Sequence, residues 1–159
     1  MDRLSQILWR ERELLELLSF KLEVERLVLA SGRTRYLASA TREIEDVLAS
    51  LRETELMRAI AADAAADELG LAANPSLAAL AEAAPQPWRA ILVEHRDALV
   101  SVAREIADLS TENKGLLSAG FRAAQETLLA IGGASTESYT PAGAAVVDAP
   151  RSRLIDRAL

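Results

Sequence analysis

A long segment with helical periodicity and almost no helix-breaking residues constrains this chain most. From about Leu4 to Leu69 the sequence contains no proline and a single glycine, Gly32. At about 1.5 Å of rise per residue, an uninterrupted helix over this range is about 95 Å long. Gly70 then supplies a helix stop signal. We therefore expect one long helix that ends near Gly70.

A second long segment carries a heptad pattern. Between Trp88 and Ile131 the steps alternate between four and three residues, a spacing typical of a helix-packing seam. The seam comprises Trp88, Leu92, His95, Leu99, Val102, Ile106, Leu109, Asn113, Leu116 and Gly120. Two long helices with a short connection fold back on each other, so we expect an antiparallel, coiled-coil-like helical hairpin. Proline-containing segments on either side predict a short connecting helix over about 76–84.

Composition supports an all-α fold and limits the function. Half of the 159 residues are apolar, only 4% are aromatic, and Leu and Ala dominate, as they do in long helices. The formal net charge is −6 with evenly mixed signs, which argues against a nucleic-acid partner because phosphate binding requires clustered Lys and Arg. No signal-peptide pattern and no run of about 18 apolar residues occur, so we expect neither secretion nor membrane insertion. The absence of cysteine fits a cytoplasmic protein.

A change in composition divides the chain into two parts. Gly132-Gly133 end the second long helix, and Ser, Thr, Pro and Gly become frequent afterwards. We expect a helical hairpin domain over residues 1–133 and a flexible C-terminal tail over residues 134–159. Apolar and aromatic residues in this tail are either docking elements or chance features of a mobile terminus. They are Tyr139, Val146, Val147, Leu154 and Ile155.

The first helix carries more apolar surface than one partner helix covers. Between Leu14 and Leu29 the large apolar residues spread over roughly two-thirds of the helix circumference, whereas those of the second long helix fall mainly within an arc of about 140°. A soluble protein rarely leaves such a surface bare. We expect Phe20, Val24 and Leu27 to contact the folded-back tail, a second subunit or a client protein. A tail that covers this face permanently is the simpler alternative.

Few residues suit catalysis or metal binding. His95 is the only histidine and lies on the heptad seam, where a structural role is the better interpretation. The sequence lacks the His-Glu-x-x-His zinc pattern, the Glu-x-x-His di-iron pattern, Gly-x-Ser-x-Gly and a phosphate-binding loop. We therefore expect no enzymatic activity, no cofactor and no metal site.

Asn113 is a polar residue within the seam. Buried amides at such positions fix helix register at a cost in stability. If the hairpin closes near residues 70–87, Asn113 faces the first helix around Gly32 to Tyr36, where Gly32 permits close approach and Thr34 or the backbone binds the amide. The alternative is a solvated Asn at the edge of the seam.

Several short segments along the whole chain indicate a relationship to a protein family, and their combined order is more specific than any one of them alone. They are Leu8–Leu15, Phe20–Glu23, Leu29–Leu37, Glu112–Leu117, Tyr139–Gly143 and Ser152–Asp156. In this order they resemble, from end to end, the actinobacterial branch of the FlgN family.

The resemblance implies a cytoplasmic type III secretion chaperone for the hook-filament junction proteins of the bacterial flagellum, of the FlgK and FlgL type. Such chaperones prevent premature assembly of their clients and deliver them to the export apparatus. The resemblance also implies that the C-terminal region holds the C-terminal helical segment of the client. It further implies that a tyrosine in this region docks to the export gate protein FlhA, a role that would fall on Tyr139, the only tyrosine in this tail. The competing hypothesis is a structural, homo-oligomeric coiled-coil protein without a client, and the sequence leaves the oligomeric state open.

Overall fold

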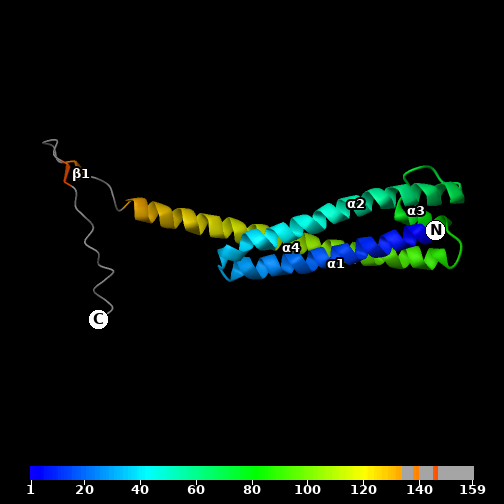
Figure 1. Ribbon diagram of the computed structural model, residues 1–159, viewed down its shortest axis with the longest axis horizontal. Helices are drawn as coiled ribbons and strands as arrows, with labels where there is room; N and C mark the ends of the chain where they lie inside the picture. The colour runs from blue at the N-terminus through cyan, green and yellow to red at the C-terminus, as the bar shows by residue number, and fades with distance from the viewer. Residues whose placement is uncertain (134–137, 140–144, 147–159) are drawn as a thin grey trace. The chain divides into compact units, whose positions relative to one another are not determined.

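The computed structural model describes residues 1–133, 138–139 and 145–146 (Figure 1). Its elements in chain order are α1 (Asp2–Ala30), the 3-10 helix η1 (Thr34–Tyr36), α2 (Leu37–Leu69), α3 (Leu77–Ala83), α4 (Trp88–Gly133), β1 (Ser138–Tyr139) and β2 (Ala145–Val146). The two short strands pair antiparallel, with Tyr139 opposite Ala145. The prediction of an all-α fold with long packed helices and a short connecting helix is confirmed. Apart from the four strand residues, the predicted tail lies outside the described residues.

The first long helical segment is interrupted at Gly32. Gly32 has a φ of +66°, in the left-handed region that is open to glycine but costs other residues about 1–2 kcal/mol. The hydroxyl of Ser31 donates to a backbone carbonyl in the last turn of α1, and the chain then turns back into α2. The predicted single helix from Leu4 to Leu69 is therefore wrong. Its predicted end is correct, because α2 stops at Gly70, which has a φ of +69°.

The chain divides into two compact units, Met1–Ala119 and Gly120–Leu159. Within the first unit, α1 and α2 form an antiparallel hairpin, and α4 packs along both of them (Figure 1). Helix α4 runs parallel to α1, because the start of α1 contacts His95 and a later turn of α1 contacts Asn113. The antiparallel hairpin of the structure is formed by α1 and α2, whereas the predicted one joined the segment before Gly70 to the helix that begins at Trp88. The first unit is therefore a bundle of three long helices instead of two.

Two clusters of buried apolar residues hold this bundle together. The middle cluster joins the three long helices through Leu14, Leu18, Leu22, Ile44, Val47, Leu51 and Leu109. The second cluster lies where α3 packs against the end of α2, beside the start of α1. It comprises Leu4, Leu8, Ala61, Ala62, Ala65, Ala66, Leu80, Ala81, Ala84 and Leu92. Small alanine side chains let neighbouring helix backbones approach closely there. The alanine-rich end of α2 therefore makes room for α3.

Candidate protein-binding surfaces

Helix α1 exposes a line of large apolar side chains. Leu17, Phe20 and Leu27 are 41%, 58% and 59% exposed, and Val24 is half-buried. Their spacing of three, four and three residues places them on one face of the helix. We call these four residues the α1 stripe. The structure thus brings the three residues predicted from the sequence together on one surface, and their contact with another chain stays a prediction.

A groove between α1 and α4 lies beside the α1 stripe. It has a volume of about 360 Å³ and is lined by Glu16, Ser19, Phe20, Glu23, Val102 and Glu105. Ser19 is only 7% exposed, and its hydroxyl has no hydrogen-bond partner among the described residues. Glu16 pairs with Arg12 at 2.8 Å, whereas Glu105 has no charged partner in the described part of the chain. The groove therefore combines apolar walls with polar groups that are free to bind a ligand.

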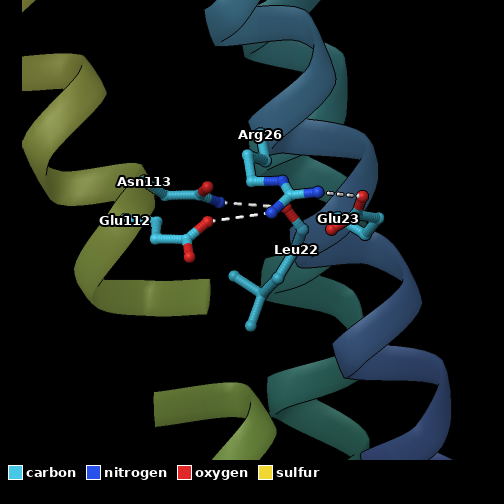
Figure 2. Close-up of polar contacts among 5 residues, drawn as sticks. All are labelled: Leu22, Glu23, Arg26, Glu112 and Asn113. Atoms are coloured by element: carbon cyan, nitrogen blue, oxygen red, sulfur yellow. Dashed lines mark hydrogen bonds and ion pairs between the residues drawn. The ribbon is translucent and has the colours of Figure 1, made fainter. Parts of the chain in front are cut away.

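A charged network lies next to the groove, where α1 meets α4 (Figure 2). Arg26 donates to Glu23 at 2.6 Å and to Glu112 of α4 at 2.9 Å. Figure 2 shows the guanidinium group between the two carboxylates. Hydrogen bonds to Glu112 and then to Glu23 raise the pKa of Arg26. The single positive charge of Arg26 faces the two negative charges of Glu23 and Glu112, so it neutralises only one of them.

Asn113 of α4 is buried against α1. Its Nδ2 donates to the backbone oxygen of Leu22 and to a carboxylate oxygen of Glu25, both at 3.0 Å, while its Oδ1 has no partner. The predicted burial in the seam is correct, but the predicted position opposite Gly32 and Thr34 is wrong. The cause is the turn after α1: α4 runs parallel to α1, which changes the register of the two helices.

His95 is buried between α1 and α4, as its seam position predicts. Its Nε2 lies 3.3 Å from the Ser5 hydroxyl, and its ring meets Trp9 edge-on at 5.0 Å between centroids. Burial lowers the pKa of His95; the Glu94 carboxylate opposes this effect and the Arg12 guanidinium adds to it. The imidazole is therefore held in its neutral form as part of the helix interface.

Glu11 is a buried acid on the side of α1 that faces α2. Its Oε2 lies 2.9 Å from Nε of Arg58, although the two groups are not aligned as a hydrogen bond. Burial raises the pKa of Glu11, an effect that Arg58 partly offsets and Glu55 increases. The pair joins α1 and α2, and we find no ligand-binding role for it.

Helix α4 exposes a second line of apolar residues in the second unit. Phe121, Leu128 and Ile131 are 71%, 69% and 68% exposed, and Ala124 is exposed between them. Their three-four-three spacing repeats that of the α1 stripe, and we call them the α4 stripe. Sequence reasoning missed this surface. Beyond Leu116 the seam positions hold only small or polar residues, and the large apolar residues stand one position later in the heptad. This shift is the sequence signal from which the surface could have been predicted.

The remaining predicted site residues lie near the end of the chain. Tyr139 is in β1 and Val146 is in β2. Val147, Leu154 and Ile155 lie outside the described residues.

Two further features concern metals and membranes. In the described part of the chain, no three Asp, Glu or His side chains gather in a way that suits a metal ion. Within residues 1–133, no helix has both the length and the apolar content needed to cross a membrane.

Comparison with known proteins gives one result. A family profile described as FlgN protein matches residues 1–146. No curated protein and no solved structure matches the chain.

Proposed function

The chain belongs to the FlgN family of flagellar export chaperones, and on this basis we propose that it binds hook-filament junction proteins, of the FlgK and FlgL type, before their export. In this proposal it prevents the early assembly of these clients and delivers them to the export gate protein FlhA. The FlgN family is not an enzyme family, and we expect no catalysis here. We expect the protein to act in the cytoplasm, where its clients are made.

The exposure of the α4 stripe carries this proposal. Phe121, Leu128 and Ile131 are each about 70% exposed on one face of a helix. Contiguous apolar surface of this kind marks interaction sites, and a heptad-spaced face is suited to a second amphipathic helix. Burying each large side chain contributes about 1.5–3 kcal/mol. A helical segment near the C-terminus of the client is the partner that we propose for this face.

The end of the chain completes the proposed binding region. We propose that Val146, Val147, Leu154 and Ile155 add apolar contacts to the client. Tyr139 is the residue that we propose for docking to FlhA. The family resemblance of Tyr139–Gly143 and Ser152–Asp156 supports the roles of Tyr139, Leu154 and Ile155. Val146 and Val147 are assigned from their apolar character and their place between these two segments.

The first prediction tests the α4 stripe with a matched pair of variants. The double variant Leu128→Ser, Ile131→Ser should bind the C-terminal segments of FlgK- and FlgL-type proteins from the same genome at least 10-fold more weakly than the unaltered chain. The control is Leu56→Ser, Ile60→Ser on α2, which removes the same residue types at 70% and 65% exposure. Isothermal titration calorimetry measures both affinities, and thermal melts verify folding.

Two results would contradict the proposal. Equal losses in both double variants would place client binding elsewhere, and no binding by the unaltered chain would remove the proposed clients. Light scattering on the same samples addresses the structural alternative, which the exposed α4 stripe also permits. A stable homo-oligomer that is dispersed by the α4 substitutions and ignores every client would favour a structural coiled coil.

A further inference from the structure

The groove beside the α1 stripe combines apolar walls with polar groups that have no partner among the described residues. Its walls include the ring of Phe20 and the side chain of Val102, and the α1 stripe borders it. These groups offer apolar contact to a neighbouring helix and to the aliphatic stem of a long side chain. The residues of this stripe belong to the first unit, and none of them is part of the α4 stripe or of the chain end to which we assign client binding.

The polar groups of the groove specify the charge of a ligand. Ser19 is 7% exposed and its hydroxyl has no hydrogen-bond partner among the described residues, and the exposed Glu105 carboxylate has no charged partner among them. A Lys ammonium or Arg guanidinium donates several hydrogen bonds and accepts none. Such a group satisfies both the hydroxyl oxygen and the carboxylate. An incoming acid would instead meet an unpaired negative charge.

The charges around the groove favour the same ligand. Glu16, Glu23, Glu105 and Glu112 supply four carboxylates, and Arg12 and Arg26 are paired with three of them, which leaves a net charge of −2. The Lys21 ammonium lies 5.6 Å from the centre of the Phe20 ring but is paired with Glu43, so this pair does not change the net charge. Flanking charges of this kind set partner choice between helices.

A second copy of this chain is a poor match for the surface. Glu16 and Glu23 flank the α1 stripe on its α4 side. Antiparallel pairing of two stripes opposes these acids with the same acids of the other copy, which is unfavourable. Parallel pairing opposes Glu16 with Lys21, whose Nζ is already 2.6 Å from Glu43. The partner must therefore supply basic residues that this chain does not offer here.

We propose that this surface binds an amphipathic helix of another protein, which lays its apolar face on the α1 stripe and inserts one Lys or Arg side chain into the groove between Ser19 and Glu105. The interaction is independent of client binding by the α4 stripe. It gives the protein a second docking site, with a preference for basic helices.

Two synthetic fluorescent peptides test the predicted charge preference on the full chain. Both are about three heptads long with Leu at the seam positions; one carries Lys at the flanking positions and the other carries Glu. By fluorescence anisotropy at low salt, the basic peptide should bind about 10-fold or more tightly than the acidic one. The preference for the basic peptide should become smaller in 0.5 M salt, because the screening length between exposed charges is only roughly 3–5 Å at that concentration. Equal binding of the two peptides would overturn the proposal.

A matched pair of variants locates the binding site. Glu105→Gln should weaken binding of the basic peptide by about 3- to 10-fold, whereas Glu53→Gln, which removes a charge from an exposed position on α2, should leave it unchanged. Thermal melts should show that both variants fold like the unaltered chain. Equal effects of the two substitutions would show a general response to net charge and would overturn the assignment of the groove.

Photo-crosslinking identifies what occupies the surface. A benzoylphenylalanine in place of Phe20 should crosslink to the basic peptide, and mass spectrometry then reads the product. Crosslinks to a second copy or to residues 147–159 of the same chain, with none to the peptide, would assign the surface to that occupant and overturn the proposal.

Discussion

The buried polar residues of the first unit determine how its helices are matched. Asn113, His95 and Glu11 are 5%, 3% and 8% exposed, and each contacts a partner on a different helix. Because a buried polar group without a partner is costly, a shift in helix register would separate all three from their partners. These residues therefore favour one alignment of α1 with its neighbours.

The altered pKa of His95 makes stability depend on pH. The neutral imidazole is favoured in the folded state, so the pKa is lower there than in the unfolded chain, where it is near 6.5. The unfolded chain thus binds the proton first as the pH falls. Stability should be full above about pH 6.5 and should decrease as the pH falls through that value toward the lower pKa of the folded state.

Denaturant unfolding between about pH 7.5 and 5.5 measures this effect, and His95→Gln serves as the non-titrating comparison. The chain has no other histidine, so the variant should lose most of the slope in that range. A slope that persists in the variant would assign the pH dependence to other groups. Glu11 has the opposite effect on the free energy of unfolding, because its pKa is raised in the folded state. Its contribution changes only between about pH 4.5, the ordinary value, and that raised pKa.

Asn113 is predicted to tolerate an apolar replacement better than an acidic one. Asn113→Asp places a carboxylate beside the Glu25 carboxylate in a buried site, and we expect it to cost about 2–3 kcal/mol. Asn113→Leu removes two hydrogen bonds and also the unpartnered Oδ1, and we expect a change within about 1 kcal/mol. Chemical denaturation compares the two free energies of unfolding. A similar large loss in both variants would show that the hydrogen bonds, and not the charge, decide.

At the scale of the elements, the turn between α1 and α2 determines the fold of the first unit. Without it α1 would continue into α2, and the middle cluster of buried apolar residues would have no antiparallel partner. Gly32 takes up the left-handed conformation in this turn, and an added Cβ would meet nothing within 4 Å. Any cost of a larger residue there therefore comes from the backbone alone.

This turn leads to a prediction with opposite signs at two glycines. Gly32→Ala should destabilise the protein by about 1–2 kcal/mol, because alanine is strained at positive φ. Gly115→Ala in α4 also meets nothing within 4 Å but has ordinary helical geometry, so it should stabilise by about 0.5–1 kcal/mol. Thermal melts compare both variants with the unaltered chain. A higher melting temperature for Gly32→Ala would contradict the left-handed turn.

At the scale of the whole molecule, sequence periodicity predicted local features better than the arrangement of helices. The seam of α4 from Trp88 to Leu116 and the stop at Gly70 were correct because both depend on nearby residues, whereas Gly120, predicted in the same seam, is exposed. The break at Gly32 was missed because one glycine costs a helix only about 1 kcal/mol. What decides against a continuous helix is the burial gained when α2 folds back on α1, and that gain depends on residues far apart in the sequence.

The candidate surfaces follow the same rule. The exposure of Phe20 and Leu27 was predictable, because α1 carries more apolar residues than its neighbours cover. The groove was not, because Val102 and Glu105 lie beside Ser19 only when α4 runs parallel to α1. An antiparallel hairpin of two helices would have matched these residues differently.

The parallel direction of α1 and α4 also determines how the first unit responds to force. Met1 and Ala119 lie toward opposite ends of the bundle, because α1 begins beside the start of α4 and ends beside its later turns. Tension applied between these two residues therefore loads the α1–α4 interface in shear, along its length. Contacts under shear resist together instead of opening one after another. Forced unfolding is governed by the rate of unfolding. The first unit should therefore stay folded longer under tension between Met1 and Ala119 than under tension that pulls α1 sideways from α4.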